Sequence, residues 1–119
     1  MLSEQTIPSV TKRRKLEGLI DEATEGALSC EEEAMGFLYM IYEAVDTPFE
    51  AQVNGEPVTI LDFATGNQGV TLQAICRSGN QKLRVNLDSI EWPTPRPEGF
   101  DWVLAYFQWR GQEQGLTIL

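Results

Sequence analysis

Apolar residues recur at helical spacing in the first third of the chain. From Ser9 they fall on one side of a helix, at Leu16, Leu19, Ile20 and Ala23. After Ser29 the apolar face is broader and holds Ala34, Phe37, Leu38, Ile41, Tyr42 and Val45. A recurrence every three or four residues is typical of an amphipathic helix. The pattern therefore predicts helical structure over residues 9–47.

The second helix has clear start and stop signals. Ser29, followed three residues later by Glu32, forms a capping box, which fixes the start of a helix. Pro48 disfavours helical backbone at Thr47 and therefore ends it. Beyond the proline, polar residues alternate with Phe49, Ala51 and Val53. This alternation predicts that a half-buried strand follows the helix directly.

The middle of the chain keeps the strand period over residues 48–92. Apolar positions alternate with polar ones in three further runs, at Val58, Ile60 and Phe63, at Val70, Leu72, Ala74 and Cys76, and at Leu83, Val85 and Leu87. Turn sequences rich in Gly and Asn, TGNQG and RSGNQ, separate these runs. Short strands joined by tight turns predict a small antiparallel, SH3-like barrel or strongly curled sheet.

A proline-rich stretch, WPTPRPEG, separates the strands from a last helix, predicted over residues 97–110. Pro97 lies in its first turn and Gly111 is placed to end it. Its two faces carry Phe100, Val103, Leu104 and Phe107, and Trp102, Tyr106 and Trp109. We expect these side chains to be core, because large aromatic residues dominate packing. The alternative is that one aromatic face is exposed for a partner.

These elements predict one α+β domain over residues 1–119, with residues 1–8 loose at the terminus. Helices flank the curled sheet on both sides in sequence. No apolar run approaches the roughly 18 residues of a membrane span, and the N-terminus lacks the hydrophobic core of a signal peptide. We therefore expect a cytoplasmic protein that does not associate with membranes.

The net charge of the chain limits the kinds of partner that it is expected to bind. The chain has 18 Asp and Glu against 9 Lys and Arg, so its formal net charge is −9. A strongly acidic surface disfavours nucleic acid and favours cations or basic protein surfaces. The basic cluster at residues 12–15 is a weak nucleic-acid footprint on such a chain, and a solvated helix face that offsets the acidic remainder explains it better.

The residue types that are absent exclude several chemistries. The chain has no histidine, which excludes Ser–His and Cys–His nucleophile pairs and imidazole metal sites. Cys30 and Cys76 are far apart in sequence without CxxC spacing, so neither a zinc site nor a disulfide framework is indicated. A bound metal must therefore be held mainly by oxygen ligands, which points to hard cations such as calcium or magnesium.

The first candidate metal site is the twelve-residue segment 21–32 between the two predicted N-terminal helices. Asp21, Glu25, Gly26 and Glu32 take positions 1, 5, 6 and 12 of the EF-hand order. Ala23 supplies no ligand at position 3, and Glu25 is longer than the usual residue at position 5. The segment is therefore either a weak calcium site, with a dissociation constant on the order of 10⁻⁵ to 10⁻³ M, or an ordinary helix junction.

A second candidate lies at the other end of the long helix. Glu43 and Asp46 are three residues apart and share one helical face, with Glu50 just beyond the proline. Free carbonyls and the negative end of the helix dipole favour a cation there. The alternative is a solvated acidic face.

The run from Glu31 to Val53 resembles the signature of the small acidic calcium-binding proteins typified by cyanobacterial CcbP. That family has an acidic helix start, Ala-x-Gly-aromatic, a Tyr-rich helix, and Pro-Phe-x-Ala entering a strand. The corresponding residues here are Glu31 to Ala34, Gly36, Phe37, Tyr39, Pro48, Phe49 and Ala51. Glu43 falls where the family usually carries an acidic residue, and Asp101–Trp102 is similar to its C-terminal Asp-Trp.

The resemblance implies a small barrel-like sheet with flanking helices that binds Ca²⁺ through surface carboxylates and buffers or senses it. Together with the two candidate sites it leads us to expect Asp21, Glu25, Glu32 and Glu43 as calcium ligands. The predicted function is therefore non-enzymatic calcium binding.

Two other classes of function stay open. An acidic, compact chain with an exposed aromatic helix is also typical of an inhibitor or interaction protein that covers a basic surface of a partner protein, for example one that binds nucleic acid. An enzyme is the least favoured class. Asp62, Asp88 and Asp101 with Lys82 have the groups for acid–base work, but no spacing joins them.

Overall fold

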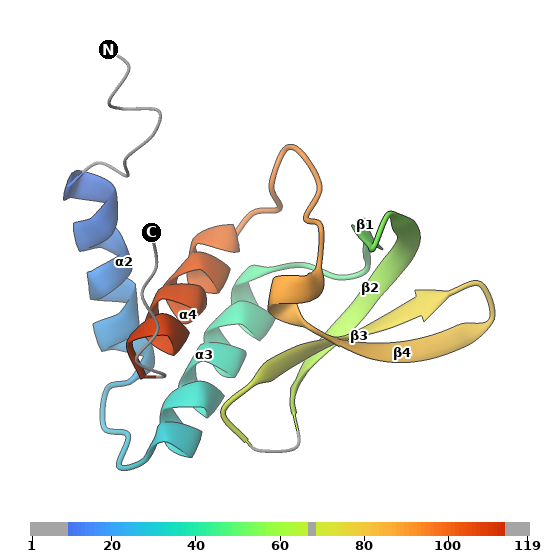
Figure 1. The fold of residues 1–119 in the computed structure, drawn as a ribbon. Helices are drawn as coiled ribbons and strands as arrows, with labels where there is room; N and C mark the ends of the chain where they lie inside the picture. The colour runs from blue at the N-terminus through green and yellow to red at the C-terminus, as the bar shows by residue number, and fades with distance from the viewer. Residues whose placement is uncertain (1–9, 67–68, 114–119) are drawn as a thin grey trace.

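The computed structural model describes residues 10–66 and 69–113. The elements follow in the order α2 (Val10–Ala23), α3 (Cys30–Ala44), β1 (Phe49–Val53), β2 (Glu56–Thr65), β3 (Leu72–Ser78), β4 (Gln81–Asn86), a short 3-10 helix η1 (Leu87–Ser89) and α4 (Phe100–Glu113). Figure 1 shows α2, α3 and α4 gathered on one side, with the β3–β4 hairpin extending away from them. Among the described residues, every helix is too short or too polar to span a bilayer.

The sheet is a meander in which each strand pairs antiparallel with the next, in the order β1-β2-β3-β4. Asn54 and Gly55 join β1 to β2, and both have positive φ, 54° and 78°. A two-residue hairpin turn with positive φ at both positions matches the right-handed twist of its strands. The turn therefore fixes the β1–β2 register, in which Val53 faces Glu56.

The sheet curls at a β-bulge in β2. Ile60 pairs with Cys76 and Asp62 with Ile75, which leaves Leu61 as an extra residue. A bulge bends its strand and increases the local twist. Because the strand order is linear and β1 and β4 remain the two edges, the sheet is curled but not closed. The predicted α+β fold with a curled antiparallel sheet is confirmed, in its open form.

The core lies between the helices and the sheet. It joins Ala34, Phe37 and Ile41 of α3 to Val58, Ile60, Leu72, Ala74 and Cys76 of the sheet and to Val103, Ala105, Tyr106 and Trp109 of α4. The Phe37 ring lies 6.0 Å from the ring of Tyr106 and 5.3 Å from that of Trp109, between centroids. Tyr106 and Trp109 of the last helix are therefore core, as expected, and the half-buried Phe100, Trp102 and Phe107 pack against it.

The bounds of α4 differ from the predicted 97–110. Gly99 has φ of +87°, a left-handed conformation that an α-helix cannot contain, so the helix begins at Phe100. Gly111 is buried inside the helix, which continues to Glu113. A glycine ends a helix when its backbone takes the left-handed conformation just after the last helical turn. Gly111 is not one of the glycines with positive φ in the described part of the chain, so the helix continues through it.

Candidate metal centre

The connection between α2 and α3 is a compact turn. The backbone N–H and Oγ1 of Thr24 both donate to the carbonyl oxygen of Ile20, at 3.0 and 2.8 Å. Gly26 then reverses the chain with φ of +76°, and the Ala27 N–H donates to the Thr24 carbonyl at 3.0 Å. Of the twelve residues in the EF-hand-like segment, residues 21–23 therefore belong to α2 and residues 30–32 to α3. Only residues 24–29 form the connection.

The start of α3 is capped as the sequence predicts. The Glu32 N–H donates to Ser29 Oγ at 3.1 Å, and the Leu28 N–H donates to Glu32 Oε1 at 2.8 Å. The glutamate thus reaches back one residue beyond the N-cap. One oxygen of the predicted ligand Glu32 is already engaged in holding the helix start.

The four predicted ligands lie in the end turns of α2 and α3 and in the turn that connects these helices. Asp21 is in the last turn of α2, Glu25 is in the connecting turn, and Glu32 and Glu43 are in the first and last turns of α3; all four are exposed. Asp21, Glu25 and Glu32 belong to the same helix–turn–helix junction. Glu43 is eleven residues along α3 from Glu32, which at 1.5 Å per residue is about 16 Å. Glu43 therefore cannot share an ion with Glu32.

The donor chemistry fits a hard cation, whereas no ligand group is preassembled. Carboxylate oxygens are the ligands that Ca²⁺ prefers. Within residues 10–66 and 69–113, no three His, Cys, Asp or Glu residues come together closely enough to hold a metal ion. Calcium binding at these carboxylates therefore requires side chains to move, with water or backbone carbonyls completing the coordination.

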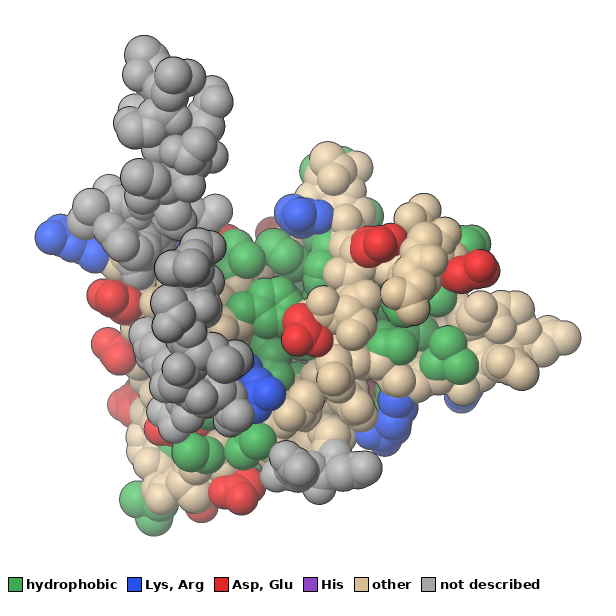
Figure 2. Space-filling model, in the orientation of Figure 1, with side chains coloured by type: hydrophobic (Ala, Val, Ile, Leu, Met, Phe, Trp, Pro, Cys, Tyr) green, Lys and Arg blue, Asp and Glu red, His purple; other side chains and the backbone are tan. Residues whose placement is uncertain are grey.

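Acidic residues are nevertheless concentrated on the surface near the junction. Figure 2 shows Asp and Glu side chains along the edge of the molecule formed by α2.

At the C-terminal end of α3, Glu43 and Asp46 are both exposed, and the Val45 N–H caps the helix by donating to the Ile41 carbonyl. Glu50 is engaged nearby, because its Oε2 accepts a hydrogen bond from Thr59 Oγ1 at 3.0 Å.

Two carboxylates that sequence reasoning did not single out as structural connect distant helices. Glu33 Oε1 accepts a hydrogen bond from Trp109 Nε1 at 2.9 Å and so links α3 to α4. Lys15 Nζ lies 2.7 Å from Asp101 Oδ2 and so links α2 to α4. The partners are too far apart in sequence for any local pattern to indicate the contact. These carboxylates act in packing the helices.

Burial changes the titration of two groups in the core. It raises the pKa of the Cys76 thiol. It also raises the pKa of the Tyr106 hydroxyl, an effect that the hydrogen bond from the Leu72 N–H, at 2.8 Å, partly offsets. Both shifts favour the neutral form, which is the opposite of an activated nucleophile.

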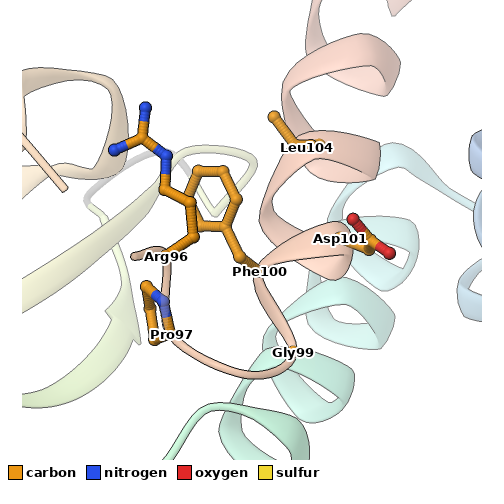
Figure 3. Close-up of a pocket in the computed structure, with 6 residues that line it drawn as sticks. All are labelled: Arg96, Pro97, Gly99, Phe100, Asp101 and Leu104. Atoms are coloured by element: carbon orange, nitrogen blue, oxygen red, sulfur yellow. The ribbon is translucent and has the colours of Figure 1, made fainter. Parts of the chain in front are cut away.

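A cavity of about 450 Å³ lies at the start of α4 and is lined by Arg96, Pro97, Gly99, Phe100, Asp101 and Leu104. Figure 3 shows the Arg96 side chain extended beside the Phe100 ring, and its guanidinium carbon is 5.2 Å from the ring centroid. Arg96 Nη1 also donates to the Trp92 carbonyl at 2.8 Å. With a fixed arginine and an aspartate paired to Lys15, this cavity does not provide a cation site.

No family model matches the sequence, and a search of curated proteins finds no match. Solved structures do match. The crystal structure of Anabaena CcbP is similar with a TM-score of 0.67 and 17% identity, over 87% of this chain and 92% of that chain. A calcium-binding protein in its calcium-binding form is similar with a TM-score of 0.65 and 19% identity, over 94% of this chain and 100% of that chain. The chain therefore has the CcbP fold, which confirms the resemblance seen in the sequence at the level of fold.

Proposed function

We propose that this protein binds Ca²⁺ through surface carboxylates. The observation that carries the proposal is the fold, which is shared over nearly the whole chain with CcbP and with a protein described as calcium-binding. The composition agrees, since a chain with 18 Asp and Glu and no histidine offers the oxygen ligands that a hard cation prefers.

The carboxylates form two candidate groups. Asp21, Glu25 and Glu32 belong to the α2–α3 junction, and Glu43 with the neighbouring Asp46 belongs to the far end of α3. The negative end of the helix dipole favours a cation at the second group. Because the described residues hold no preassembled cluster, we expect a dissociation constant on the order of 10⁻⁵ to 10⁻³ M.

A non-catalytic role fits the chemistry of the described residues. Burial raises the pKa of Cys76 and of Tyr106, so neither is prepared as a nucleophile. The cavity at the start of α4 is lined by the positively charged side chain of Arg96, which donates to backbone carbonyls and lies over the Phe100 ring. The predicted cytoplasmic location remains an inference from the sequence.

Isothermal titration with CaCl₂ at physiological ionic strength tests the proposal. We expect heat that saturates below a few millimolar calcium. Glu32→Gln should weaken binding about tenfold by removing a charged ligand, while its amide oxygen still accepts the hydrogen bond from Leu28. Glu43→Gln tests the second group separately.

Glu56→Gln is the matched control, because Glu56 is an exposed carboxylate at the β1–β2 turn, outside both groups. It should leave the titration unchanged. A flat titration of the wild-type protein would reject the proposal. Equal losses in Glu56→Gln and Glu32→Gln would show diffuse attraction of cations in place of a site.

The same titration followed by near-UV circular dichroism separates a buffer from a sensor. A buffer leaves the packing of Tyr106 and Trp109 unchanged when calcium binds. A sensor exposes new surface and alters the aromatic signal, because it converts between two packed states.

A further inference from the structure

α3 has a second apolar face that the fold does not bury. Its inner face places Ala34, Phe37 and Ile41 in the core. On the other side, Met35, Tyr39 and Tyr42 are 52%, 60% and 60% exposed. Their spacing of four and three residues aligns them in one row along the helix. We call Met35, Tyr39 and Tyr42 the α3 stripe.

The residue types in the α3 stripe are those that contribute most to protein interfaces. Tyrosine supplies a large, rigid contact area with little loss of side-chain freedom, and it is enriched among residues that dominate binding energy. Methionine adapts to irregular partner surfaces. A solvent-facing helix side normally carries polar residues, so packing among the residues that the structure describes does not explain the row.

Carboxylates surround the α3 stripe. Glu31 and Glu32 lie within one turn of Met35, Glu43 lies one turn beyond Tyr39, and Asp46 follows the helix. From Cys30 to Ala44 the helix contains no Lys or Arg. The face is therefore apolar along its middle and negative at both ends.

We propose that the α3 stripe and its flanking carboxylates form a docking surface for a basic amphipathic helix of a partner protein. The partner's apolar side covers Met35, Tyr39 and Tyr42, and its Lys and Arg residues meet the acidic flanks. Charge complementarity selects this occupant. A second copy of the chain would bring the two acidic flanks together, and phosphate groups of nucleic acid or of an anionic membrane would meet carboxylates.

A synthetic amphipathic peptide of Leu and Lys, about 18 residues or five helical turns long, is the probe. Its binding is followed by fluorescence anisotropy in EDTA, so that calcium does not contribute. The double variant Tyr39→Ser/Tyr42→Ser should weaken binding about 30-fold or more, as expected for central aromatic contacts. Glu31→Gln should reduce affinity several-fold and should also reduce its dependence on salt.

Leu83→Ser is the matched control, because Leu83 is also an exposed apolar residue but lies on β4. It should bind the peptide like the wild type. All of these side chains are exposed, so circular dichroism and thermal unfolding should show intact folds. A peptide with Glu in place of Lys should not bind, and one with Ala in place of Leu should bind at least about tenfold more weakly.

Equal affinity of the wild type and the tyrosine double variant would overturn the proposal. Self-association of the wild type in sedimentation that the double variant abolishes would also overturn it, by showing a second copy as the occupant. Because the assay contains EDTA, either failure leaves calcium binding untouched. Failure of the calcium titration likewise leaves this surface untouched.

Discussion

Three consecutive glutamates at the start of α3 have three different environments. The Glu31 side chain lies close to Gly69, where the loop before β3 approaches the helix. Glu32 holds the helix start by accepting from the Leu28 N–H, and Glu33 holds α4 by accepting from the Trp109 indole. Negative charge in a first turn is also favoured by the helix dipole. A run of identical acidic residues thus serves capping and packing, and its charge alone does not make it a metal site.

Tyr106 provides a test at the residue scale. Its hydroxyl oxygen accepts a hydrogen bond from the buried Leu72 N–H, so Tyr106→Phe should cost about 1–3 kcal/mol in the free energy of unfolding near neutral pH. Burial raises the pKa of Tyr106 above its ordinary value of 10.0. The stabilisation by neutral Tyr106 is therefore fully present below pH 10.0 and is lost as pH rises toward the folded value.

Urea unfolding of the wild type and of Tyr106→Phe, below and above pH 10.0, measures the free energy of unfolding of each protein. The difference in the free energy of unfolding between wild type and Tyr106→Phe should become smaller as the tyrosine of the unfolded wild type ionises. Cys76 contributes to the pH dependence of both proteins, so its effect cancels in the comparison. A gap that stays constant across the range would contradict the assigned environment of the hydroxyl.

At the scale of elements, α2 and α3 approach each other closely at a glycine. A Cβ at Gly36 of α3 would overlap the carbonyl oxygen of Ala23 at the end of α2. The approach positions the α2–α3 junction, and with it Asp21, Glu25 and Glu32. Gly18, in contrast, has nothing within 4 Å of its Cβ position.

Alanine at these two positions should have opposite effects. Gly18→Ala should stabilise the protein by up to about 1 kcal/mol, because alanine has the higher helix propensity. Gly36→Ala gains the same propensity but should be destabilising by about 2 kcal/mol or more, because backbone must shift to admit the methyl group. Urea unfolding measures both. Equal effects of the two substitutions would show that the close approach at Gly36 does not exist in solution.

Local signals were sufficient to predict the elements and insufficient for their exact ends. The capping pair Ser29 and Glu32 and the alternation within the strands depend on neighbouring residues, so they are readable in the sequence. The end of α4 depends on the burial of Gly111, and its start depends on the conformation of Gly99. Both follow from tertiary packing, which local residue patterns do not encode.

The sequence indicates which carboxylates are candidate metal ligands, but it does not indicate how they are arranged in space or what they contact. Sequence spacing places Asp21, Glu25 and Glu32 at one junction and Glu43 on the same helix. It does not reveal that Glu32 is engaged at the cap or that Glu33 holds Trp109. The α3 stripe was also missed, because the helical pattern placed Tyr42 on the buried face, whereas in the structure its side chain is 60% exposed.

At the scale of the whole molecule, the helices and the open curled sheet enclose one core and leave the charged groups outside. No buried polar or charged side chain is found among the described residues. The charged side chains of these residues are therefore at the surface, and the net charge of −9 attracts cations and basic partners. The shared fold with CcbP and the carboxylates at the ends of α3 make calcium the first ligand to test.

The most direct test is a CaCl₂ titration of the ¹⁵N-labelled protein followed by amide chemical shifts, with MgCl₂ as the control. Saturating shifts should be confined to residues 21–32 and to the surroundings of Glu43, with half-saturation on the order of 10⁻⁵ to 10⁻³ M. Amide positions that do not respond to calcium, or that drift without saturation and equally in magnesium, would contradict calcium binding by this protein.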